Sequence, residues 1–136
     1  MKKILLSLSL LAVLGLGFAY YLYNKPHQNI KKAEADFQME AIALFSAFEA
    51  DEASANKKYL DKIIEISGIV KEAGKAEGGI LTITLEAGDM MFGVRCQLDE
   101  LTEHKRVDFK EGEKVTFKGI CTGMLMDVVL VRCVEV

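Results

Sequence analysis

The sequence has few of the residues on which metal, haem and disulfide-rich proteins depend. Its 136 residues include one proline, no tryptophan, two histidines and three cysteines. The single proline excludes collagen-like and proline-rich classes, and the content of Ile, Leu and Val excludes a disordered chain. His27 and His104 are far apart and there is no C-x-x-C motif, so we predict no metal site and no cofactor. No nucleophile motif is present either, and we therefore predict no catalytic residues and no enzymatic activity.

Beyond the N-terminal run, acidic residues outnumber basic ones. Lys2 and Lys3 are two of the 17 basic residues, and all 20 acidic residues follow them, so residues 24–136 carry a net charge of −5. An acidic domain repels phosphate backbones at long range. The composition therefore argues against general nucleic-acid binding. The chain length is that of a single domain.

The longest uncharged run covers residues 4–23. A helix needs about 20 apolar residues to cross the hydrocarbon core of a bilayer, so this run suits a membrane anchor. An uncleaved anchor over residues 1–23 is the favoured interpretation, because three tyrosines at its end suit the membrane interface. A signal peptide cleaved near the Gly17-Phe18-Ala19 stretch and a buried helix of a soluble protein stay open as alternatives. No cysteine precedes Cys96, which excludes a lipidated N-terminal cysteine.

Lysines flank this run on both sides in nearly equal number, so the positive-inside rule alone discriminates weakly. A short basic segment at the extreme N-terminus usually stays inside. We therefore expect a single-pass protein of the bacterial cell membrane, with its domain facing the periplasm or the cell exterior and residues 4–23 as the membrane contact.

The next two segments differ in pattern. Residues 24–30 are polar, and Pro26 opposes a helix there, so they are predicted as a linker. Residues 31–58 are predicted as an amphipathic helical segment, because apolar residues from Phe37 to Phe48 recur with a helical period. We expect this stripe to pack on the domain that follows; the alternative is a partner chain or the membrane surface.

After Tyr59 the apolar period changes to two, which predicts an all-β domain over residues 59–136. Five strands are predicted, at residues 62–73, 80–86, 91–98, 114–121 and 127–136. Gly68 interrupts the first strand and predicts a bend or bulge. Asp99 is predicted to cap a short helix over residues 100–107. Five strands with a helix between the third and fourth are the layout of the OB-fold, a Greek-key barrel.

Two stretches also resemble the tRNA_anti-like family of bacterial OB-fold proteins. The first runs from Ala50-Asp51-Glu52-Ala53 to Ile66-Ser67-Gly68-Ile69-Val70. The second runs from Lys110-Glu111-Gly112-Glu113-Lys114-Val115, through Gly119-Ile120-Cys121-Thr122-Gly123, to Arg132-Cys133. The resemblance covers roughly residues 40–136 and implies an OB-fold, often behind a signal or anchor segment. It implies no particular activity, because fold does not fix function.

An OB-fold that binds nucleic acid needs a basic face with aromatic stacking platforms on its second and third strands. The outward face of those strands is predicted to include Thr82, Thr84, Arg95 and Gln97, without an aromatic residue. We interpret it as a possible ligand or partner face and expect nucleic acid to be a poor ligand, although lysines in nearby loops could add charge.

The cysteines and one loop complete the candidate residues. Cys121 and Cys133 lie on consecutive antiparallel strands and are the favoured disulfide pair; a bridge to Cys96 and three buried thiols stay open. The loop residues Met124, Leu125 and Met126 either plug the barrel mouth, which is favoured, or contact a partner.

These features together predict a membrane-anchored, extracytoplasmic OB-fold module with a non-enzymatic binding or scaffolding role and a protein or oligosaccharide partner. The alternative is an oligonucleotide- or oligosaccharide-binding domain.

Overall fold

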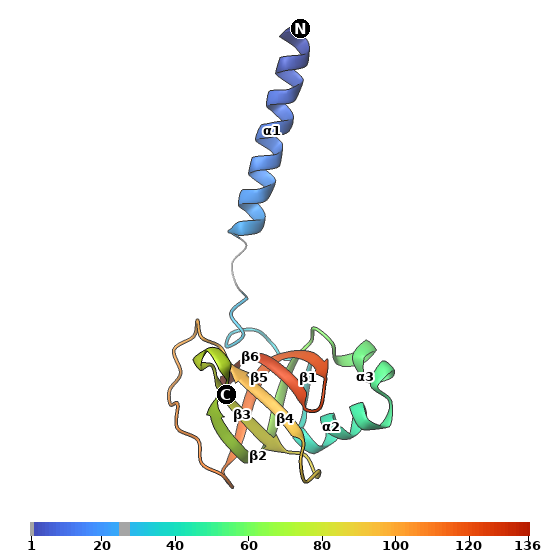
Figure 1. Ribbon diagram of the computed structural model, residues 1–136, viewed down its shortest axis with the longest axis vertical. Coiled ribbons are helices and arrows are strands. Elements are labelled where there is room, and N and C mark those ends of the chain that lie inside the picture. Colours follow the sequence, from blue (N-terminus) through green and yellow to red (C-terminus); the bar gives the residue numbers. More distant parts are fainter. Residues whose placement is uncertain (1, 25–27) are drawn as a thin grey trace.

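The computed structural model describes residues 2–24 and 28–136. Helix α1 (Lys2–Tyr23) extends away from the remaining chain, and none of its residues is buried (Figure 1). It is the one helix in the described part of the chain that is long and apolar enough to cross a membrane. Pro26 and His27, which the sequence places in the linker, lie outside the described residues.

Five strands form a closed barrel, as the sequence predicted. Strand β2 pairs with β3, β3 with β4, β4 with β6 and β6 with β5, and β5 pairs back with β2 to close the circle. The β4–β6 pair is parallel and the other pairs are antiparallel. The bounds are β2 (Ile63–Lys75), β3 (Leu81–Glu86), β4 (Gly93–Leu98), β5 (Lys114–Met124) and β6 (Val128–Glu135), with the 3-10 turn η1 (Glu77–Gly79) between β2 and β3.

Strand β2 makes closure possible by changing partners along its length. Residues Ile63 to Ile69 pair with β5, and residues Val70 to Lys75 pair with β3, with an irregular register after Val70. Gly68 lies just before this change, where a side chain would meet Ala41 and Leu85 at 3.1–3.3 Å. The predicted bend is therefore confirmed close to the predicted position.

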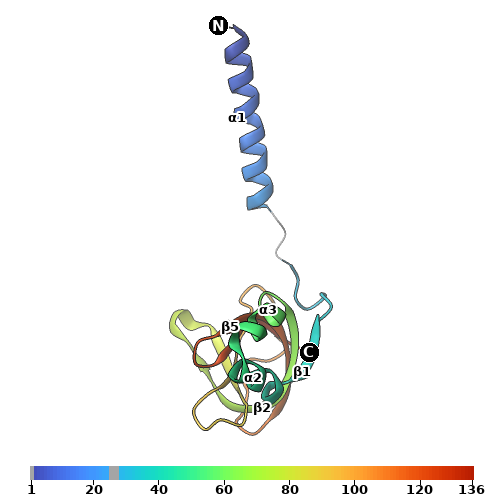
Figure 2. The same ribbon diagram turned by 90° about the vertical axis from the view of Figure 1, so that its right-hand side faces the viewer.

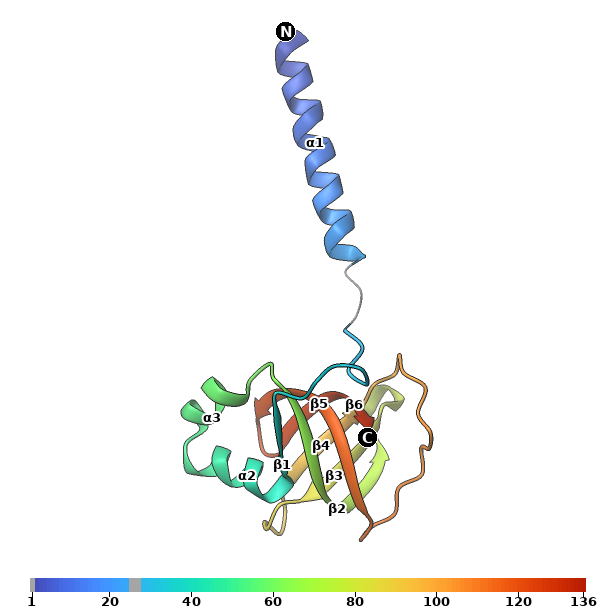
Figure 3. The same ribbon diagram turned by 180° about the vertical axis from the view of Figure 1, so that it is seen from behind.

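The prediction of one helical segment over residues 31–58 is wrong in its first third. Strand β1 (Phe37–Glu40) runs parallel to β2, and helices α2 (Ala41–Ala50) and α3 (Glu52–Tyr59) follow it. Figure 3 shows β1 beside β2. Two hydrogen bonds between Asp36 and Ile63 hold the start of this strand against β2. The Asp36 N–H donates to the Ile63 carbonyl (2.7 Å), and the Asp36 carboxylate accepts from the Ile63 N–H (2.9 Å).

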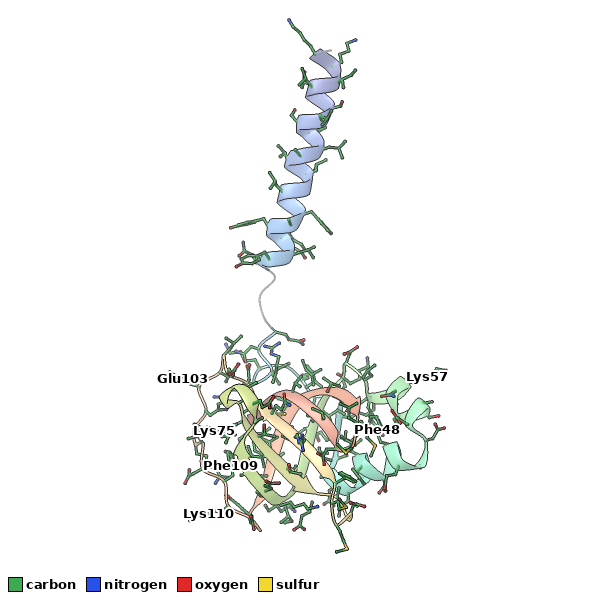
Figure 4. All side chains as sticks on the ribbon, viewed as in Figure 1. Phe48, Lys57, Lys75, Glu103, Phe109 and Lys110 are labelled. Atoms are coloured by element: carbon green, nitrogen blue, oxygen red, sulfur yellow. The ribbon has the colours of Figure 1, made fainter. Side chains whose placement is uncertain are left out.

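Helix α2 closes one end of the barrel, and the predicted packing of its apolar stripe is confirmed. Leu44, Phe45 and Phe48 are buried in the barrel core. Figure 2 shows α2 and α3 in front of the barrel, and Figure 4 places Phe48 between α2 and the strands. Asp51 separates the two helices and caps α3 by accepting the Ser54 N–H at 3.1 Å.

The helix predicted at residues 100–107 is absent, and a loop over residues 99–113 joins β4 to β5. Leu101 and Val107 are exposed in this loop, so a helix there would have no apolar face to bury. Asp99 still accepts bonds from its neighbours, including the Thr102 hydroxyl at 2.6 Å. The loop is fixed instead by Phe109, which packs on Phe117 of β5.

Residues 30–33, which follow α1 in the chain, are bound to the barrel. Ile30 is fully buried against Ile63 and Val134. The buried Lys118 ammonium donates to the carbonyls of Lys31 (3.2 Å) and Ala33 (2.8 Å). The predicted linker over residues 24–30 therefore ends in a segment that is docked on the barrel wall.

Candidate functional site

The outward face of β3 and β4 carries the predicted polar residues side by side. Thr82 lies opposite Gln97, and Thr84 lies opposite Arg95. Together they line a shallow groove of about 230 Å³. The sequence therefore identified four residues that the fold brings to one surface.

Strand β2 contributes the other wall of this groove, which sequence reasoning missed. Glu72, Gly74, Lys75 and Ala76 complete the lining. The first strand is predicted to end at residue 73, whereas β2 continues through Lys75 in register with β3. The alternation of inward and outward residues continues through Ala73, which lies against the core opposite Ile83. This alternation is the sequence signal that could have identified β2 as the second wall of the groove.

Arg95 is held in place by Asp127, the residue before β6. The guanidinium contacts the Asp127 carboxylate at 2.7 Å, and the other carboxylate oxygen accepts the Gly93 N–H at 2.8 Å. The Asp127 side chain is buried, whereas that of Arg95 is 48% exposed. Arg95 thus presents a fixed, half-exposed donor group to the groove.

The chemistry of the groove is polar and mildly cationic. Arg95 and Lys75 supply positive charge, Glu72 supplies one negative charge, and hydroxyl and amide groups supply donors and acceptors. The lining contains no aromatic side chain. The groove can therefore hydrogen-bond a polar or anionic group, but it offers no platform on which a base could stack.

The loop predicted to plug the barrel mouth is only partly tucked in. Met124 packs against the core, but Leu125 is 92% exposed and Met126 is 63% exposed. The favoured interpretation is therefore wrong for Leu125 and Met126, which project into solvent. Met90 and Met91, in the turn between β3 and β4, are also exposed, and sequence reasoning did not single out Met90.

The three cysteines are buried free thiols, so the predicted Cys121–Cys133 bridge is absent. Cys121 lies opposite Leu130, and the register between β5 and β6 shifts on both sides of this pair. Cys133 instead lies beside Cys96 of β4. Burial raises the pKa of the Cys133 thiol well above its usual value, and that of Cys121 is raised for the same reason.

His104 does not lie in the groove. Its Nε2 atom is 2.6 Å from the carbonyl oxygen of Asp99, in the loop after β4. Among the residues that the structure describes, no three His, Cys, Asp or Glu side chains are grouped as a metal site would require. The prediction that the protein is not an enzyme stays a prediction.

Comparisons with known proteins agree with this architecture. The model of the tRNA_anti-like family matches residues 1–135, which includes the apolar N-terminal helix. A crystal structure from Klebsiella pneumoniae subsp. pneumoniae, named "putative nucleic acid-binding lipoprotein", superimposes with a TM-score of 0.58 at 15% identity. The match covers 82% of this chain and 98% of that chain. No curated protein gives a significant match.

Proposed function

Because the chain belongs to the tRNA_anti-like family, we propose that it is a membrane-anchored, non-enzymatic binding module whose barrel lies outside the cytoplasm. Helix α1 supplies the anchor, and the barrel supplies the binding surface. Lys2 and Lys3 at the start of α1 favour retention of the N-terminus in the cytoplasm, which sends the barrel to the other side.

The observation that carries this proposal is the docked segment after α1. Only residues 24–27 separate Tyr23 from Gln28, whose carbonyl accepts a bond of 2.7 Å from Arg132. At about 3.5 Å per residue, this connection spans less than ~20 Å. An anchored α1 would therefore hold the barrel next to the bilayer, as suits a module that acts at the membrane.

Fractionation of cells tests the anchor. We expect the full-length protein to stay in the membrane pellet after carbonate and high-salt washing, because α1 would be integral to the bilayer. External protease should digest the barrel in intact spheroplasts. Recovery of a soluble form that begins near Tyr20 would instead establish a cleaved signal peptide, and a protected barrel would reverse the topology.

The second candidate function is binding of an oligonucleotide or oligosaccharide in the groove. Lys75 and Arg95 on one surface favour it, because two cations in one groove suit an anionic polymer. The Klebsiella protein with the same fold is also named for nucleic-acid binding. The lack of aromatic lining and the net negative charge of residues 24–136 argue for the first function over this one.

A further inference from the structure

Four apolar side chains project from neighbouring turns at the start of β4 and β6. We name them the apolar pole: Met90 (93% exposed), Met91 (77%), Leu125 (92%) and Met126 (63%). Val94 pairs with Val128 in the parallel β4–β6 ladder, and Gly93 bonds to Asp127 at 2.8 Å. The two turns that carry the pole are therefore side by side.

The turn between β3 and β4 is built to hold its methionines outward. The Lys71 ammonium donates to the carbonyls of Asp89 (3.1 Å) and Met90 (2.8 Å). The Asp89 carboxylate accepts the N–H groups of Met91 (2.7 Å) and Phe92 (2.8 Å), which lowers its pKa. Because the backbone is fixed, a partner would not have to order this turn before binding.

The bilayer that holds α1 does not cover the apolar pole. Strand β6 begins next to the pole, and Val134, near its other end, packs on Ile30 of the docked segment. At about 3.3 Å per residue, the strand separates the two sites by roughly 20 Å. In Figure 1 the turn between β3 and β4 lies at the end of the barrel away from α1. This step rests on the proposed membrane anchor.

The sign of the domain's net charge indicates the kind of partner. Glu86, the last residue of β3, and Asp89, in the turn between β3 and β4, are exposed. Lys71 offsets Asp89, and Lys114 lines the same hollow as Glu86, so the charges beside the pole nearly balance. Residues 24–136 as a whole carry a net charge of −5. A cationic partner would complement this negative field.

From these observations we propose that the apolar pole binds a protein segment with an apolar centre flanked by lysine or arginine. Methionine side chains suit this role because they are flexible and adapt to differently shaped apolar residues. The interaction adds a protein partner to the proposed anchored module and leaves the groove free.

A pair of labelled peptides tests this proposal against full-length protein in phosphatidylcholine nanodiscs, with empty nanodiscs as the blank. Both peptides have the same leucine and phenylalanine centre; one is flanked by lysines and the other by glutamates. We expect the lysine peptide to bind at least about tenfold more tightly by fluorescence anisotropy. Equal affinity for the two peptides would overturn the proposed partner.

Matched variants locate the binding surface. Met91→Glu and Leu125→Glu should each weaken binding of the lysine peptide about tenfold or more. As controls, Leu101→Glu and Val107→Glu change exposed apolar residues of the loop over 99–113 and should leave this binding unchanged. An equal effect of all four variants overturns the proposal. Sedimentation could also show a dimer that dissociates in Leu125→Glu. This result would overturn the proposal, because a second copy of the chain would then occupy the apolar pole. A protein that fractionates as soluble but still binds the lysine peptide refutes the anchor alone.

Discussion

Asp127 links the groove and the apolar pole through a single buried carboxylate. Its two oxygens bind Arg95 and the Gly93 N–H, which lie far from it in the sequence. No sequence pattern pairs these residues, because their proximity depends on the parallel register of β4 and β6. The sequence identified Arg95 as outward-facing from strand alternation, but the partner that fixes it required the fold.

Variants at Asp127 separate its two contacts. Asp127→Ala leaves the buried Gly93 N–H without its acceptor, so we expect a loss of about 1–3 kcal/mol in the free energy of unfolding. Asp127→Asn keeps an acceptor oxygen and loses only the ion pair with half-exposed Arg95, which is worth under ~1 kcal/mol. Urea denaturation compares the two variants. Equal losses would show that the Gly93 bond contributes nothing.

Gly68 offers a test of close packing in β2. A Cβ there would meet Ala41 and Leu85 at 3.1–3.3 Å, whereas a Cβ at Gly74 in the same strand would meet nothing within 4 Å. We expect Gly68→Val to destabilise the protein by more than ~1 kcal/mol and Gly74→Val to be nearly neutral. Thermal and urea melts measure both. Similar midpoints for the two variants would contradict the packing described here.

The buried thiols predict a specific labelling pattern. Because Cys96, Cys121 and Cys133 have no exposed surface, and burial raises the pKa of Cys121 and Cys133, native protein should react slowly with iodoacetamide. Unfolding in urea without reductant should expose three reactive thiols, measured by mass spectrometry. Addition of only one alkyl group would reveal a disulfide, and peptide mapping would identify its pair.

At the scale of elements, alternation predicted the strands better than the helical period predicted the helices. The barrel strands bury one face, so their apolar residues repeat every second position. Phe37 fits both a helical stripe and the short strand β1, and only the bonds between Asp36 and Ile63 decide for the strand. The helix expected at residues 100–107 failed for another reason: Leu101 and Val107 find no surface to pack on and stay exposed, which no local pattern reveals.

Arg106 holds the loop over 99–113 together with Phe109. Its guanidinium bonds to Glu113 and Glu135 and lies over the Phe109 ring at 4.5 Å. Figure 4 shows the loop passing along the barrel through Glu103, Phe109 and Lys110. These contacts tie the middle of the loop to its end and to the last strand.

This cluster predicts a pH dependence of stability. The hydrogen bond from Arg106 lowers the pKa of Glu113 below its ordinary 4.5, so the charged form is favoured in the folded state. The stabilisation is therefore complete above pH 4.5 and is lost as the pH falls through the lowered pKa. Arg106→Gln should flatten this dependence in urea midpoints measured between neutral and acidic pH, and should speed hydrogen exchange in the loop. An unchanged slope would assign the acid sensitivity to other carboxylates.

At the scale of the whole molecule, the apolar helix α1 and the barrel could be predicted from the sequence, whereas the docking of the segment between them could not. The apolar run and the period-two strands each follow from local pattern. The bonds from Lys118 to two carbonyls join residues more than eighty positions apart, and Ile30 packs on Ile63 and on Val134 near the other end of the chain. The candidate groove shows a milder division: its β3 and β4 wall was predicted from alternation, whereas the end of its β2 wall, at Gly74 and Lys75, was missed.

Nucleic-acid binding is the property on which the fold and the charges of this chain disagree. The barrel is of a type that binds oligonucleotides, and the groove contains Lys75 and Arg95. Against this, residues 24–136 carry a net charge of −5, and no aromatic side chain lines the groove to supply the ~1–3 kcal/mol per base that stacking contributes. Two cations, one of them already paired with Asp127, release few counterions from a phosphate backbone.

We therefore expect no binding of single-stranded DNA or RNA tighter than roughly 100 μM at physiological salt, the weak end of non-specific affinity. Fluorescence anisotropy with labelled oligonucleotides measures this directly. Micromolar binding that falls steeply with added salt would contradict the expectation. Lys57→Ala is the control, because Lys57 is an exposed lysine of α3 outside the groove. If binding were lost in Arg95→Ala and Lys75→Ala but kept in Lys57→Ala, the groove would be a nucleic-acid site. The second candidate function would then replace the first.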